Sequence, residues 1–98
     1  METIGQRFKK IRQAKYLSQN DFGANLKMSK SGISAVENDK VFLSVDVLRT
    51  LFFDFDVNLN YLIVGKGDMF NPPEYVYVKD EILREVNEIL KKYGVKNI

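Results

Sequence analysis

The 98-residue sequence contains no cysteine and no histidine. These absences exclude disulfides, thiol catalysis, Ser-His-Asp chemistry and the common zinc sites, because each of them needs a thiolate or an imidazole. The sequence has no run of about 18 apolar residues that would predict a membrane helix, and residues 1–5 lack the apolar stretch of a secretory signal. We therefore expect a cytoplasmic protein that is not an enzyme, with no metal, no cofactor and no contact with a membrane.

Charge is distributed unevenly along the chain, although the formal net charge is only +2. Residues 1–40 contain eight Lys and Arg against four Asp and Glu, whereas residues 41–98 contain seven against nine. A positive half beside a negative half is expected when one face of a protein binds a polyanion. A surface with randomly placed charges is the alternative explanation.

Five short helices are predicted in the first 70 residues, where apolar residues recur at helical spacing. Ile4, Phe8 and Ile11 mark the buried face of the first helix, and Arg7, Lys9 and Lys10 give it a basic outer face. Each of the next four helices follows a residue whose side chain can cap a helix start, and these predicted N-caps are Ser18, Ser29, Ser44 and Asn58. We predict one all-α domain over residues 1–70.

The C-terminal residues 71–98 follow a different pattern. Asn71-Pro72-Pro73 cannot continue a helix and predicts a stiff hinge. Residues 75–78 are rich in strand formers and predict a short extended segment, after which helical periodicity returns from Asp80 onward. The apolar stripe of this last predicted helix consists of Ile82, Leu83, Val86, Ile89, Leu90 and Tyr93.

That apolar stripe predicts a contact with something outside its own helix, because a helix of about 14 residues is marginal alone in water. We interpret residues 71–98 as a dimerisation segment that buries the stripe against a second copy of the chain. Phe42 and Phe53 favour the same interpretation, since aromatic residues outside a core often mark contact surfaces. The alternative is a tail that folds back on its own domain.

Two of the short helices are typical of a DNA-reading unit. Gln19 opens the first, a tight turn at Lys27-Met28 follows, and Ser29-Lys30-Ser31-Gly32 opens the second. In such a unit one helix crosses the phosphate backbone while the next inserts its N-terminal side chains into the major groove. Gly23 would permit close approach of the two helices, although glycine inside a helix costs about 1 kcal/mol relative to alanine.

The segment from Leu17-Ser18-Gln19 to Glu37-Asn38, with Phe22, Gly23, Leu26, Met28, Ile33 and Val36, resembles the XRE family of Cro- and lambda-repressor-like regulators. The resemblance extends over residues 3–65, and Gly65-Lys66-Gly67-Asp68-Met69-Phe70 is similar to the domain end of many phage-type repressors. It implies an all-α, five-helix, lambda-repressor-like domain. It also implies a sequence-specific repressor that binds an inverted-repeat operator in double-stranded DNA as a homodimer.

The resemblance also assigns roles to individual residues. It implies a structural ion pair between Arg12 and Glu37, and it places Lys27 and Asp39 where the family usually has glycine in a left-handed turn. Lys30 could donate to guanine, whereas Ala35 could only touch a thymine methyl. The implied base-reading residues are Lys30, Ser31, Ser34 and Ala35, next to the cap Ser29, and the implied phosphate contacts are Gln19, Asn20, Asn38 and Lys40.

Each of these assignments has an alternative. Gln19 could be an ordinary exposed residue at a helix start, and the polar residues after Ser29 could form a solvated face with Ser29 acting only as a cap. For Lys9, Lys10 and Lys15 solvation is the favoured interpretation, because their helix only skirts DNA in such folds. Asp54, Asp56 and the glycines near Lys66 show no ligand set or phosphate-loop spacing and are assigned no chemistry.

A second hypothesis for the whole chain is an antitoxin or similar interaction protein. Its hydrophobic C-terminal segment would bind a different protein, with DNA binding kept for autoregulation. In either case we expect no small-molecule effector, and we expect the protein to lie at the nucleoid when it is bound to DNA.

Overall fold

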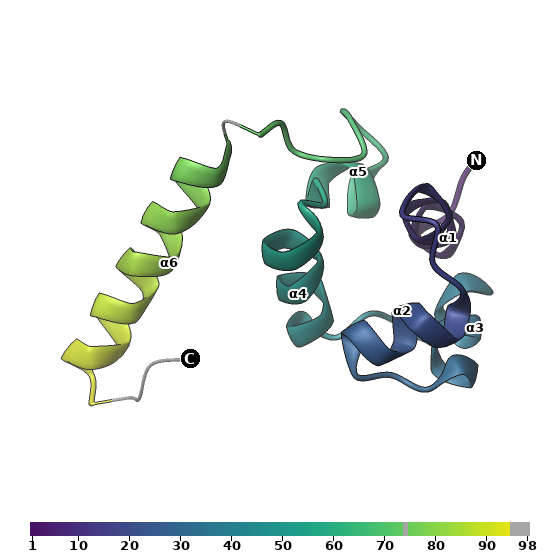
Figure 1. The fold of residues 1–98 in the computed structure, drawn as a ribbon, viewed down its shortest axis with the longest axis horizontal. Coiled ribbons are helices and arrows are strands. Elements are labelled where there is room, and N and C mark those ends of the chain that lie inside the picture. The colour runs from purple at the N-terminus through teal and green to yellow at the C-terminus, as the bar shows by residue number, and fades with distance from the viewer. Residues whose placement is uncertain (74, 95–98) are drawn as a thin grey trace.

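Six helices and no strand make up the part of the chain that the structure describes. The computed structural model describes residues 1–73 and 75–94, with the side chains of 75–80 left out. The all-α prediction is confirmed, and an isolated antiparallel bridge joins Val57 to Phe70. The helices are α1 (Ile4–Ala14), α2 (Gln19–Leu26), α3 (Lys30–Glu37), α4 (Val45–Phe55), α5 (Leu59–Val64) and α6 (Tyr75–Lys92). Figure 1 shows α1 to α5 gathered into one body, with α6 on its α4 side.

All four predicted N-caps are confirmed. The hydroxyl oxygens of Ser18 and Ser29 accept hydrogen bonds from the third backbone N–H of their helices, each at 3.0 Å. Ser44 does the same at 3.2 Å, and the Asn58 side chain accepts from a backbone N–H at 3.1 Å. Each bond satisfies one of the orphan donors that every helix start carries. Thr3 caps α1 through a capping box with Gln6, in addition to the four predicted caps.

The core lies between the first five helices, which we call the five-helix body (residues 1–70). Phe22 is its centre, with its ring 5.1 Å from the ring of Phe8 and 5.5 Å, edge-on, from that of Phe55. Offset and edge-on aromatic pairs of this kind add to the stabilisation from burial. The buried apolar side chains are Phe8, Ile11, Phe22, Leu26, Ile33, Val36, Val47, Leu51, Val57 and Leu62.

Arg7 corrects the prediction of a uniformly basic outer face on α1. Its residue is only 7% exposed, and its guanidinium donates to the carbonyl oxygens of Leu62 (2.8 Å), Ile63 (3.3 Å) and Glu2 (2.8 Å). The last carbonyls of a helix have no partner within the helix. Arg7 donates to two of these carbonyls at the end of α5. These hydrogen bonds explain why a charged residue is buried inside the body.

Helix α6 corrects a second prediction. Residues 75–78 were expected to be extended, but α6 begins at Tyr75 and is helical throughout to Lys92. Strand propensity is a weak local preference, and the three-four spacing of the apolar residues in α6 continues back along the sequence to residues 78 and 75. The helical period therefore describes this segment better than its composition does.

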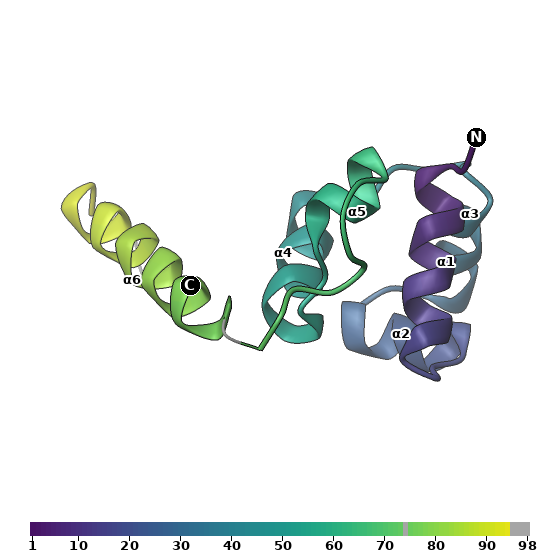
Figure 2. The same ribbon diagram turned by 90° about the horizontal axis from the view of Figure 1, so that it is seen from above.

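The backbone of helix α6 lies beside α4, outside the five-helix body, in both views (Figures 1 and 2), and the side chains of Ile82 and Val86 line an apolar hollow together with α4. Its exposed apolar residues include Ile82, Val86, Ile89 and Tyr93. Within residues 1–73 and 75–94, no helix is long and apolar enough to cross a membrane. The same residues contain no group of three or more His, Cys, Asp or Glu side chains that could hold a metal ion.

Candidate nucleic-acid interface

The turn between α2 and α3 fixes how these two helices meet. Lys27 ends α2 in the left-handed conformation, with φ of 56°, and the backbone N–H of Met28 donates to Gly23 at 2.8 Å. A Cβ atom on Gly23 would lie 2.4 Å from the Met28 carbonyl oxygen and 3.5 Å from the Ile33 side chain. The expectation that Gly23 permits close approach is therefore confirmed, because any side chain there would collide with the turn.

Helix α3 has one buried and one outward face. Ile33, Val36 and Glu37 are buried, and they anchor α3 against α1 and α2. Lys30 and Ser31 are exposed, and Ser34 and Ala35 are half-buried. Positions 30, 31, 34 and 35 share one side of a helix because of its 3.6-residue period. The structure thus brings the four implied base-reading residues together on the face of α3 that points away from the core.

Two polar residues at the ends of α3 are occupied by the helix itself. The Ser29 hydroxyl caps α3 and lies 3.1 Å from the Ser31 hydroxyl. The Asn38 amide donates to the Ser34 carbonyl oxygen at 2.8 Å and to its hydroxyl at 3.4 Å. Ser29 therefore has a clear structural role, and Asn38 would have to give up one of these bonds to donate to a phosphate.

An ion pair ties α1 to α3, as the resemblance implies. Arg12 Nε lies 2.7 Å from Glu37 Oε2, and Arg12 Nη2 donates to Glu37 Oε1 at 3.2 Å. The two side chains are 12% and 3% exposed, so the pair is almost completely removed from water. Arg12 also donates to the Leu17 carbonyl at 2.9 Å, which holds the end of the α1–α2 connection next to the cap Ser18.

Gln19 is joined to this ion pair. Its amide donates to Glu37 Oε1 at 3.1 Å, which fixes the side chain at the first turn of α2. A side-chain amide carries two N–H donors, so the bond to Glu37 leaves the second one for an acceptor outside the protein. The neighbouring Asn20 is exposed. Sequence reasoning did not foresee the contact between Gln19 and Glu37, which needs the tertiary structure.

Asp39 shows how a left-handed residue other than glycine is stabilised. Its φ is 59°, as expected from its position in the family pattern. Its carboxylate accepts from the Gly5 backbone N–H at 2.9 Å and from the Thr3 hydroxyl at 2.6 Å. These bonds satisfy the start of α1 and offset the cost of the left-handed conformation. The exposed Lys40 follows Asp39, and its backbone N–H donates to the Ala35 carbonyl oxygen of α3 at 2.9 Å.

The lysines of the first helix have contacts within the chain. Lys10 forms an ion pair with Glu2, and the hydrogen bond to Glu2 together with the negative charge of that carboxylate raises the pKa of Lys10 above its ordinary value. The Lys15 ammonium lies 4.3 Å from the centre of the Phe70 ring, within the range of a cation–π interaction. With Arg7 buried as well, the positive charge of residues 1–40 is less available to a polyanion than its count implies.

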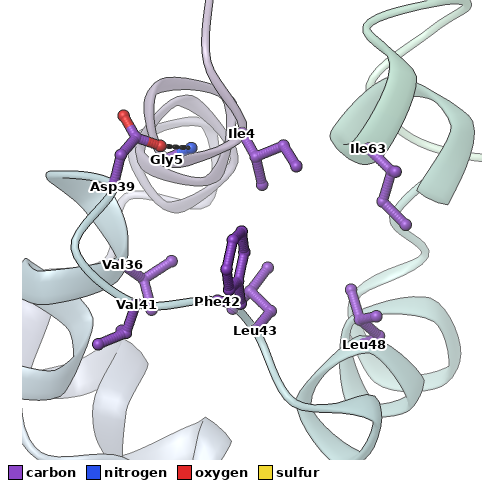
Figure 3. A pocket seen from close by; sticks show the side chains of 9 residues that line it. All are labelled: Ile4, Gly5, Val36, Asp39, Val41, Phe42, Leu43, Leu48 and Ile63. Carbon is purple, nitrogen blue, oxygen red and sulfur yellow. Dashed lines mark hydrogen bonds between the residues drawn. The ribbon is translucent and has the colours of Figure 1, made fainter.

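An apolar hollow of about 310 Å³ lies beside the C-terminal end of α3 (Figure 3). Phe42, in the loop before α4, is fully open to solvent at 96% exposure, and its ring extends toward Ile4. Asp39 is the charged residue at the rim, and its carboxylate is already bonded to Gly5. The second aromatic residue singled out from the sequence, Phe53, is half-buried and lies beside α6 instead.

Comparison with known proteins agrees with this geometry. A sequence model of a helix-turn-helix family matches residues 8–62, which is more than half of the chain and contains α2, the turn and α3. No curated protein and no solved structure matches. With its turn, its buried Arg12–Glu37 pair and this match, the chain belongs to the XRE family of Cro/C1-type helix-turn-helix regulators, which bind DNA.

Proposed function

We propose that this regulator is a sequence-specific repressor that binds an inverted-repeat operator as a homodimer. The observation that carries the proposal is the outward face of α3, which the buried Arg12–Glu37 pair holds in one orientation. A rigid recognition helix can insert the same side chains into each half-site, and a dimer meets two half-sites about one helical turn apart. Occupying a promoter in this way is sufficient to block transcription.

In this proposal the chain divides into a DNA-binding part, residues 1–70, and a dimerisation part, residues 71–98. Lys30, Ser31, Ser34 and Ala35 read base edges. Backbone phosphates are contacted by Gln19, Asn20, Asn38 and Lys40, with Ser29 holding the end of the recognition helix beside them. The exposed Lys30 is the residue best suited to bidentate recognition of guanine, because its ammonium can donate to both O6 and N7. The protein would act in the cytoplasm, at the nucleoid, without a small-molecule effector.

The residue roles can be separated by measuring affinity for operator and for random DNA in parallel. Gln19→Ala and Lys40→Ala should weaken binding to both DNAs alike, since phosphate contacts are independent of sequence. Lys40→Ala should also reduce the salt dependence, because it removes a positive charge, whereas the neutral Gln19 should leave the salt dependence unchanged. Lys30→Ala should lose about 5- to 150-fold on the operator, corresponding to about 1–3 kcal/mol, and should relax the preference at one base pair. Equal losses on both DNAs would remove Lys30 from the base-reading set.

Lys66 provides a matched control. It is an exposed lysine in the turn after α5, outside α2 and α3. Lys66→Ala removes the same charge and the same side chain as Lys30→Ala, so it should leave the affinity for operator almost unchanged. A loss of affinity as large as that of Lys40→Ala would mean that the protein attracts DNA through its overall positive charge and that the binding surface is not centred on α3.

A second candidate function is an interaction protein, such as an antitoxin, whose C-terminal segment binds a different protein. The observation that favours it is the exposure of Ile89 and Tyr93, at 55% and 76%. A purified chain that stays monomeric but forms a stable complex with another protein through α6 would support this candidate. A homodimer that buries α6 would count against it.

A further inference from the structure

Helix α6 presents an apolar stripe that its own chain covers only in part, because Ile82 and Val86 share an apolar hollow with α4 whereas Ile89 and Tyr93 are well exposed. Ile82, Val86, Ile89 and Tyr93 are 38%, 36%, 55% and 76% exposed. Leu83 and Leu90 are half-buried along one edge of the same stripe. Because apolar area exposed in this contiguous way marks an interaction surface, the stripe requires an occupant.

The stripe continues across a groove onto α4. An apolar hollow of about 390 Å³ separates the two helices, with Ile82 and Val86 on one side and Val45, which is 71% exposed, on the other. A helix lying on the α6 stripe would therefore also reach the start of α4. This extra area matters because the stripe covers only two heptads, whereas a stable coiled coil usually needs three or four.

The spacing of the stripe is the same in both directions along the helix. Its residues are four, three and four positions apart, so the order read from Tyr93 back to Ile82 repeats the order read forward. A second α6 that runs antiparallel therefore matches without any shift. It places Ile82 opposite Tyr93 of the other copy and Val86 opposite Ile89, with the two-fold axis passing between Asn87 and Glu88.

The residues that flank the stripe agree with the antiparallel arrangement. Leu83 on one edge comes beside Leu90 of the other copy, and Glu85 on the opposite edge comes beside Lys92 of the other copy. The symmetry forms each of these contacts twice. In a parallel pair the residue facing Glu85 is Leu90, which leaves the carboxylate without an opposite charge. Charge complementarity thus selects the antiparallel orientation.

We propose that two copies of this chain associate through antiparallel α6 helices, with Glu85 of each copy paired to Lys92 of the other and the edge of the interface seated in the α4–α6 groove. The inference rests on the homodimer of the proposed function and specifies its geometry. It predicts that the two five-helix bodies lie at opposite ends of the α6 pair, because α6 leaves each body at its N-terminal end.

Cysteine cross-linking tests the orientation directly, because the natural chain has no cysteine. Ile82→Cys and Tyr93→Cys proteins, mixed and oxidised, should give the mixed disulfide as the main product. Each variant alone should cross-link at least about tenfold less. In the antiparallel pair, the same position on the two copies is separated by 11 residues of helix, or roughly 16 Å, whereas a disulfide spans at most about 7 Å between Cα atoms. Strong cross-links between like positions, together with no mixed disulfide between positions 82 and 93, would establish a parallel pair and overturn the inference.

Charge exchange provides a second test that does not depend on oxidation. Glu85→Lys should weaken dimerisation about tenfold in sedimentation equilibrium, and the double variant Glu85→Lys with Lys92→Glu should restore it. Failure of the double variant to recover would overturn the proposed pairing. A chain that is monomeric at every concentration would overturn both this inference and the homodimer, while cross-links in the wrong register would overturn this inference alone.

Discussion

The five-helix body and α6 use the same sequence pattern with opposite results. In the body, apolar residues at helical spacing are buried, and Phe8, Phe22 and Leu51 are completely covered. In α6 the same spacing leaves Ile89 and Tyr93 exposed at 55% and 76%. An amphipathic pattern shows that a helix needs a partner, but it does not show whether the partner belongs to the same chain. Here Pro72 and Pro73 stand in the connection between the body and α6 and separate the two helical parts.

Phe22→Ala should have the largest effect on this comparison, because Phe22 has no exposed area and contacts two other rings. Truncating a buried phenylalanine leaves a cavity and costs about 3–5 kcal/mol. Urea unfolding should show this loss at every protein concentration. A loss below about 1 kcal/mol would mean that the core can collapse around the cavity, and that Phe22 is not its centre.

Ile89→Ala is the matched change in α6. It should leave the unfolding of the dilute, monomeric body unchanged, because Ile89 lies outside the core. Its effect should appear as weaker dimerisation, so the loss in unfolding midpoint should grow with protein concentration. A loss of the same size at all concentrations would place Ile89 in the same cooperative unit as Phe22 and remove the contrast between the two regions.

Arg12→Ala should have the next largest effect on the body. It leaves the Glu37 carboxylate, only 3% exposed, without its opposite charge, and breaking a buried ion pair costs about 3 kcal/mol or more. Lys10→Met is the control, since the Lys10–Glu2 pair is open to water and its loss should leave the midpoint of thermal unfolding unchanged. Similar midpoints for the two variants would show that burial does not distinguish these ion pairs.

Gly23→Ala should destabilise the body by about 1 kcal/mol or more. Alanine gains about 1 kcal/mol in helix propensity, but its Cβ would lie 2.4 Å from the Met28 carbonyl oxygen, and overpacking of this kind costs about 1–3 kcal/mol plus the disturbance of the turn. Guanidinium unfolding of the two proteins measures the difference. A gain in stability would mean that propensity outweighs the close approach.

Phe42→Ser should have the smallest effect. Phe42 belongs to the body by position but resembles the α6 residues in its 96% exposure. Its replacement should change the free energy of unfolding by less than about 0.5 kcal/mol. A larger loss would show that the ring covers the neighbouring hollow in solution and forms part of the core.

The features that depended on neighbouring residues were predictable from the sequence. Ser18, Ser29 and Ser44 were identified as caps because a cap and its helix lie within four residues of each other. Gly23 was identified because glycine inside a helix indicates a close contact. The face of α3 that carries Lys30 followed from helical period together with the family resemblance.

The features that depended on distant contacts were not predictable. Periodicity cannot distinguish an arginine on the surface from one that caps another helix, so the burial of Arg7 against α5 was missed. The bond from Gly5 to Asp39 joins residues 34 positions apart and has no local signal. In residues 75–78 the local preference for strand formers gave the wrong answer because the helical period of α6 continues through them.

The most direct test of the central claim is selection of bound duplexes from a random DNA library at about 0.15 M salt, where counterions suppress binding that is merely electrostatic. The account predicts an inverted repeat whose half-sites lie about one helical turn apart, and loss of one half-site base preference with Lys30→Ala. If no sequence is enriched and binding disappears as salt rises, the outward face of α3 does not read DNA sequence, and the proposed repressor function is contradicted.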